Sequence, residues 1–127
     1  MKPFPFWRSI AYAAPLTKQR WHNNARRALR LLARALELGV GHYDVRTNYG
    51  GIAVSGESIL HGSHVYVQVS QNGILFRRCS GRKDYTGRPN HFASLELLND
   101  PEALAARIER ELGPCYKSNA NEVVCAT

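Results

Sequence analysis

Residues 65–79 read Val-Tyr-Val-Gln-Val-Ser-Gln-Asn-Gly-Ile-Leu-Phe-Arg-Arg-Cys, and this stretch decides the fold class of the chain. Valine occupies every second position over 65–70, which is the period of a strand with one buried face. Asn72 and Gly73 then supply the residue types that a tight hairpin turn with positive φ requires. Residues 74–79 return as the partner strand. The stretch therefore predicts an antiparallel β-hairpin.

The flanking sequence extends this hairpin into a meander. Residues 52–60 predict a preceding strand, and 61–63 (His-Gly-Ser) predict the turn that follows it. The apolar residues within 92–98 predict one more short strand. We therefore expect an antiparallel meander of three to four strands across 52–98, because the strands follow one another through turns rather than helical crossovers. Residues 123–126 predict a last short strand.

A long amphipathic helix is predicted before the meander. Thr17 is a candidate N-cap for the periodic segment 18–38, and Gly39 and Gly41 follow where C-terminal glycines stand. The core-facing positions of this helix are Trp21, Ala25, Ala28, Leu29, Leu32, Ala35 and Leu36. The preceding residues 1–17 contain three prolines and four aromatic residues, which predicts an irregular arm packed on the body.

A second helix is predicted over 100–112. Asn99 or Asp100 is its cap, Pro101 lies in its first turn, and Gly113 follows its end. Its buried positions are Leu104, Ile108 and Leu112. The whole chain, 1–127, is then one two-layer α+β domain, with the meander packed against an N-terminal long helix and a C-terminal helix.

The net charge of +7 is concentrated in the first 47 residues, where nine Lys and Arg face only Glu37 and Asp44. Projected at about 100° per residue, the arginines of the first helix gather on one side, opposite the apolar stripe. That side contains Arg20, Arg26, Arg27, Arg30 and Arg34. A concentrated basic surface favours anionic partners, and nucleic acid is the first of these to consider.

A second basic cluster follows the hairpin. It contains Arg77, Arg78, Arg82, Lys83 and Arg88. Aromatic residues beside cations are also typical of single-strand binding, since bases stack on rings while cations contact phosphates. Trp21 next to Arg20, and the group Phe4, Phe6 and Trp7 next to Arg8, fit this description, although aromatic residues of this kind are more often anchored in the core.

No catalytic or metal-binding motif stands out. The carboxylates lack nuclease spacing, and the cysteines and histidines lack the spacing of a zinc site, so we expect neither catalytic residues, nor a metal, nor any other cofactor. One enzymatic alternative is a metal-free ribonuclease of the toxin type, in which basic side chains stabilise the phosphorane and Tyr or His moves protons. The residue types that this would need are present at Arg78, Lys83, Tyr85, Arg88 and His91.

The compartment is expected to be the cytoplasm. No apolar run approaches the roughly 18 to 20 residues that span a bilayer, so no membrane contact is expected. Arg8 and two prolines interrupt the N-terminal apolar residues, which argues against a secretory signal. The three cysteines are then expected to be reduced, while pairing of Cys115 with Cys125 stays open.

Three functions follow from these observations. The leading one is a small, basic, non-enzymatic binding protein that contacts nucleic acid, or a nucleic-acid-processing complex, through the arginine side of the first helix. The second is a protein-binding inhibitor or adaptor of phage or plasmid type, such as an anti-CRISPR or antirestriction protein, which would use the same arginines on an acidic protein surface. The third is the metal-free ribonuclease. The sequence also leaves a homodimer open.

Overall fold

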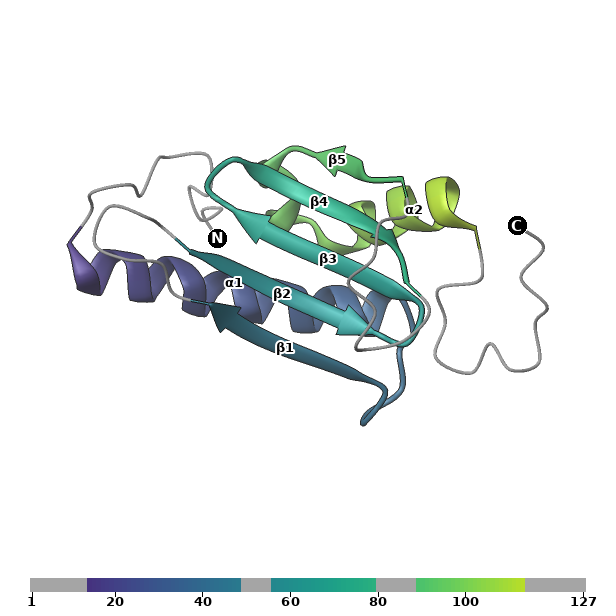
Figure 1. Cartoon of the computed structure of the whole chain (residues 1–127), viewed down its shortest axis with the longest axis horizontal. Coiled ribbons are helices and arrows are strands. Elements are labelled where there is room, and N and C mark those ends of the chain that lie inside the picture. Colours follow the sequence, from purple (N-terminus) through teal and green to yellow (C-terminus); the bar gives the residue numbers. More distant parts are fainter. Residues whose placement is uncertain (1–13, 49–55, 80–88, 114–127) are drawn as a thin grey trace.

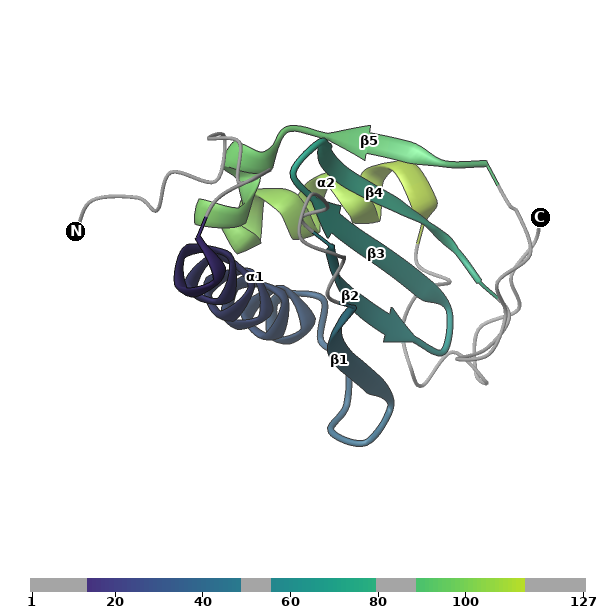
Figure 2. The ribbon, with the colours of Figure 1, turned by 60° about the vertical axis from the view of Figure 1, so that its left-hand side comes forward.

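The computed structural model describes residues 14–48, 56–79 and 89–113 and shows an α+β fold. Its five strands form one antiparallel sheet in the order β1-β2-β3-β4-β5, and both helices pack on the same face (Figures 1 and 2). The elements are α1 Pro15–Ala35, β1 Tyr43–Asn48, β2 Glu57–Gly62, β3 Val65–Ser70, β4 Gly73–Arg78, β5 His91–Ala93, the 3₁₀ helix η1 Leu95–Asn99, and α2 Pro101–Leu112. The predicted fold class is confirmed.

The hairpin of β3 and β4 confirms the prediction from residues 65–79, with the turn one residue earlier. Ser70 pairs with Gly73, so the two-residue loop is Gln71–Asn72. The positive φ falls on Gly73, at 141°, a conformation that suits a residue without a side chain. The three valines of β3 are buried, as their alternation predicts.

Two strands differ from the prediction at the start of the sheet. β1 was not predicted, and with it the meander has five strands rather than three to four. The strand predicted over 52–60 is β2, Glu57–Gly62, so that His61 and Gly62 belong to the strand instead of a turn. His61 pairs with both β1 and β3, and Gly62 pairs with Tyr43 of β1, which holds these two residues in the ladder.

The last predicted strand is shorter than expected. β5 covers only His91–Ala93, and the leucines that follow it lie in η1. Ser94 begins that helix by accepting a hydrogen bond from the backbone of Glu96. The final strand predicted at 123–126 and the N-terminal arm up to residue 13 lie outside the described residues, as do Cys115 and Cys125.

Helix α1 begins and ends three residues before its predicted limits. Pro15 is its first residue and Ala14 its N-cap, so Thr17 lies inside the first turn. Proline suits this position because its fixed φ is helical and its missing N–H would have no partner there. The helix ends at Ala35, before either glycine, because Glu37 adopts φ 61° and turns the chain.

Helix α2 confirms its prediction. Asp100 is the N-cap, and its carboxylate accepts from the backbone N–H of Ala103 at 3.1 Å. Pro101 is the first residue, and Gly113 follows the end with φ 77°. The predicted buried positions Leu104, Ile108 and Leu112 are all buried.

One large core joins the sheet to both helices. It contains the apolar stripe of α1, the valines of β3, and the buried side chains of η1 and α2. The predicted core positions of α1 are confirmed, with Ala35 only partly buried. A smaller cluster lies on the opposite face of the sheet, where Ile59, Tyr66 and Cys79 pack together with Leu75.

Candidate nucleic-acid interface

Four arginines lie on the exposed side of α1. They are Arg20, Arg27, Arg30 and Arg34, here called the arginine face. At 100° per residue they fall within an arc of about 80°, and at 1.5 Å per residue they extend over about 21 Å of the helix. The apolar stripe of the same helix is buried against the sheet, which fixes the direction in which this face points.

The four guanidinium groups have neither a hydrogen bond nor an ion pair within the described part of the chain. Helix α1 itself contains no Asp or Glu, and the carboxylate nearest to it in the sequence, Glu37, follows its last residue by two positions. Arg107 of α2 differs in this respect, since it donates to Glu111 at 2.8 Å. The arginine face is therefore a concentration of uncompensated positive charge.

Arg26, the fifth arginine predicted for this surface, points elsewhere. Its guanidinium donates to the hydroxyl of Thr47 on β1 and to the side-chain oxygen of Asn23. The residue is half-buried. Arg26 thus ties α1 to the edge of the sheet, while the other four point to solvent.

A polar network that the sequence did not reveal continues from Arg26 into the core. The hydroxyls of Thr47 and Ser58 lie 3.0 Å apart, and the Ser58 hydroxyl lies 2.9 Å from Nδ1 of His22. Ser58 and His22 are fully buried. A serine beside an imidazole is a possible nucleophile and base, but burial of both side chains keeps substrate away, and the arrangement fits a structural role.

The second predicted basic cluster is divided between the two faces of the sheet. Arg77 is buried on the face away from the helices, with its guanidinium 4.6 Å from the ring centroid of Tyr66. Arg78 points to the helix side, where its Nε donates to the carbonyl of Leu112 at 2.7 Å. A cation there also complements the C-terminal end of the α2 dipole. Arg82, Lys83 and Arg88 lie outside the described residues.

His91, named for the ribonuclease alternative, holds α2 against the sheet. Its Nδ1 lies 3.0 Å from the carboxylate of Glu111, and its ring stacks on Phe76. The hydrogen bond from Arg107, together with the one from His91, lowers the pKa of Glu111. Arg78 and His91 therefore both make contacts that dock α2. Tyr85, like Lys83 and Arg88, is outside the described residues.

Trp21, considered above as a base-stacking residue, lies in the core and is only 1% exposed. Within the described residues, the large apolar side chains exposed on α1 are Leu16 and Leu31, and neither is aromatic. The arginine face can therefore contact phosphates but offers no ring on which a base could stack.

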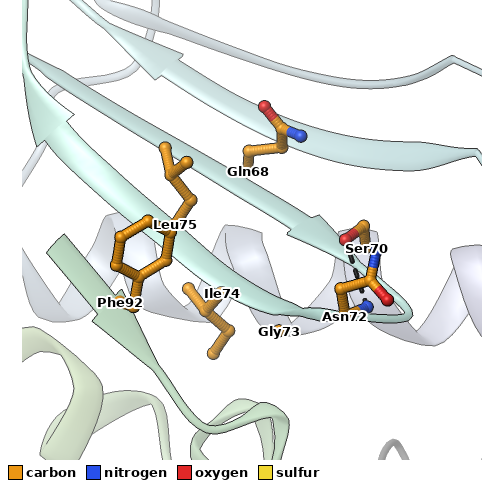
Figure 3. Close-up of a pocket in the computed structure, with 7 residues that line it drawn as sticks. All are labelled: Gln68, Ser70, Asn72, Gly73, Ile74, Leu75 and Phe92. Atoms are coloured by element: carbon orange, nitrogen blue, oxygen red, sulfur yellow. Dashed lines mark hydrogen bonds between the residues drawn. The ribbon is translucent and has the colours of Figure 1, made fainter. Parts of the chain in front are cut away.

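A shallow hollow of about 190 Å³ lies at the turn end of the β3–β4 hairpin (Figure 3). Leu75 and Phe92, which are paired across β4 and β5, lie side by side along it, and Phe92 is 63% exposed. The remaining lining residues are Gln68, Ser70, Asn72, Gly73 and Ile74. None of these seven lining residues has a charged side chain.

The described residues contain neither a metal-binding cluster nor a membrane-spanning helix. No three His, Cys, Asp or Glu side chains of residues 14–48, 56–79 and 89–113 gather in a way that could hold a metal ion. Over the same ranges, neither helix combines the length and the apolar character needed to cross a bilayer.

Comparison with known proteins gives no match: no protein-family model, no curated protein and no solved structure is significantly similar to this chain.

Proposed function

We propose that this chain is a non-enzymatic binding protein that contacts nucleic acid through the arginine face of α1. The observation that carries the proposal is the set of four exposed arginines without a carboxylate partner among the described residues. Sequence-independent contact with phosphates is the chemistry that such a surface supports.

The arginine face costs the isolated molecule free energy. Arg27, Arg30 and Arg34 lie three and four residues apart, and like charges at these spacings destabilise a helix by roughly 0.2–0.5 kcal/mol per pair. A bound polyanion removes this repulsion and releases its own counterions. The helix is therefore better suited to a complex with a polyanion than to water alone.

The dimensions of the face suit a nucleic-acid backbone. Arg20 and Arg34 are about 21 Å apart along the helix axis, a length over which duplex DNA presents about twelve phosphate charges. The planar guanidinium group can donate two parallel hydrogen bonds to one phosphate. Because the aromatic rings of this helix are buried, affinity is expected to depend on phosphates rather than on unstacked bases.

The test is a salt titration of binding to a labelled duplex of mixed sequence. Four phosphate contacts predict that log K falls against log salt with a slope of about −3.6, and replacing one contacting arginine by Gln reduces the magnitude of the slope by about 1. The variant with all four arginines changed to Gln is expected to lose this salt-dependent affinity.

Arg110→Gln is the matched control, since Arg110 is also an exposed helical arginine but lies on α2. It is expected to leave the slope unchanged. Equal loss of affinity in the control and in a single variant of the arginine face, such as Arg30→Gln, would contradict the proposal, because net charge rather than the arginine face would then explain binding. If the unchanged protein fails to bind duplex or RNA at low salt, an acidic protein surface becomes the better partner for these arginines.

A further inference from the structure

Strand β1 lies at one edge of the sheet and β5 at the other (Figure 1). A free edge presents unpaired backbone N–H and C=O groups, and proteins normally shorten, cover or interrupt such an edge. The two edges of this sheet differ in this respect.

The β5 edge is protected. The strand has only three residues, His91–Ala93, and Pro89 stands two residues before it. Arg107 of α2 donates to the backbone carbonyl of Phe92 at 2.7 Å. A second chain could form few backbone hydrogen bonds with this edge, because the strand is short and the Phe92 carbonyl already has a donor.

The β1 edge has none of these devices within the described residues. Tyr43–Asn48 pairs with β2 without interruption over all six residues, so the strand contains no bulge. Proline and glycine are both absent from it. Its outer side has no strand neighbour among the described residues.

Two residues of opposite charge, Asp44 and Arg46, flank Val45 in the sequence of this strand. Val45 packs towards the core with the helices, so Asp44 and Arg46 lie on the other face of the sheet. Asp44 is exposed and Arg46 half-exposed. The Arg46 guanidinium has no partner within the described residues. Asp44 already makes a contact in its own chain, but a carboxylate has two oxygens and accepts from several donors.

We propose that two copies of this chain pair through β1, antiparallel and with Val45 opposite Val45, to form one continuous sheet. In an antiparallel pair, the side chains of two directly opposite residues lie on the same face of the sheet. In a symmetric pair, the two-fold axis must therefore pass midway between two copies of the same residue. With the axis at Val45, Asp44 of each copy faces Arg46 of the other. In this register the charges of the β1 edge are complementary to those of the same edge in a second copy.

The charges exclude the neighbouring registers. An axis at Asp44 would put the two Asp44 side chains opposite each other, and an axis at Arg46 would do the same for the arginines. Like charges directly opposite destabilise a strand pair, whereas opposite charges and β-branched pairs stabilise it. Pairing at Val45 gives two ion pairs on one face and a valine pair on the other, so both faces favour the same register.

This dimer places both arginine faces on one side of the molecule. The two-fold axis of a continuous antiparallel sheet is perpendicular to the sheet, so the helices of both copies cover the same face. Helix α1 packs against β1 and β2, next to the proposed junction. The inference does not depend on the proposed function, since it concerns the chain without nucleic acid.

The test is sedimentation velocity of the full chain between about 5 µM and about 200 µM. The unchanged protein is expected to dimerise in this range. Asp44→Arg alone and Arg46→Asp alone each replace two attractive pairs by two repulsive ones, and each is expected to weaken the dimer about tenfold or more. The double variant Asp44→Arg with Arg46→Asp restores both pairs and is expected to restore the dimer.

Mixing supplies a second readout that does not depend on the double variant. Asp44→Arg carries arginine at both positions and Arg46→Asp carries aspartate at both, so an equimolar mixture is expected to form a heterodimer more tightly than either variant pairs with itself. Arg110→Asp on α2 is the control and should leave the dimer unchanged. A monomer at every concentration, or a dimer that neither single reversal weakens, would overturn the proposal. None of these measurements contains nucleic acid, so their failure would leave the role of the arginine face untouched.

Discussion

Ser58 is the residue whose role is hardest to predict from the sequence. It stands in β2 between Glu57 and Ile59, and nothing in its neighbours marks it as special. In the structure its hydroxyl lies between Thr47 of β1 and His22 of α1, in a fully buried position. One consistent direction of donation runs from Arg26 to Thr47, then to Ser58, then to Nδ1 of His22. This chain of hydrogen bonds joins a helix to two strands.

Ser58→Ala is expected to lower the free energy of unfolding by about 1–3 kcal/mol, because His22 and Thr47 both lose their buried partner. Urea unfolding of the two proteins measures the difference. Ser63→Ala is the control, since Ser63 lies in the turn between β2 and β3 and is partly exposed; it should cost within about 0.5 kcal/mol. Equal effects of the two substitutions would show that the network adds nothing to stability.

The end of α1 is set by hydrogen bonds rather than by a glycine. The backbone N–H of Leu38 donates to Ala33 and that of Glu37 donates to Arg34, which is the pattern of a Schellman motif. Leu38 and Ala33 are both buried, as the hydrophobic contact of this motif requires. Glu37 holds the position that glycine usually occupies, at φ 61°.

Glu37→Gly is therefore expected to stabilise the fold. A non-glycine residue in the left-handed region costs roughly 1 kcal/mol, and glycine avoids this cost. Glu37→Ala is the necessary comparison, because it removes the same side chain but keeps the strain. The glycine variant is expected to exceed the alanine variant by about 1 kcal/mol in chemical unfolding. If the two are equally stable, the backbone at this position is not strained.

The elements that were predicted well are those whose structure depends on residues close together in the sequence. The Asn72-Gly73 pair and the alternating valines gave the hairpin, and Asp100 with Pro101 gave the start of α2. The predicted start of α1 is wrong because proline excludes a helix interior but is favourable at a first helical position, which is where Pro15 lies.

Strand β1 was missed although its sequence carries a signal. Tyr43, Val45 and Thr47 alternate with Asp44, Arg46 and Asn48, which is the period of two that a strand with one buried face shows. The position of Arg26 could not be predicted in the same way. It follows from contact with Thr47, 21 residues away in the chain, and a helical projection contains no information about such a partner.

At the scale of the molecule, charge is separated between its helices. Helix α1 carries six Lys and Arg and no carboxylate, whereas η1 and α2 together, with Asp100 between them, carry five carboxylates and two arginines. The two helices pack against each other on one face of the sheet. Folding therefore gathers four of the six cations of α1, those of the arginine face, on one exposed side, an arrangement that the unfolded chain, with the same net charge, does not have.

This difference predicts that a polyanion stabilises the fold. A ligand raises the unfolding temperature only if it binds the folded chain more tightly than the unfolded one. Duplex DNA at about ten times its dissociation constant is expected to raise the melting temperature by about 5 °C at low salt. The gain should disappear when Arg20, Arg27, Arg30 and Arg34 are all changed to Gln, and it should persist in Arg110→Gln. An unchanged or lower melting temperature with DNA would mean that the unfolded chain binds at least as well, so that charge alone, and not its arrangement on α1, attracts the polyanion.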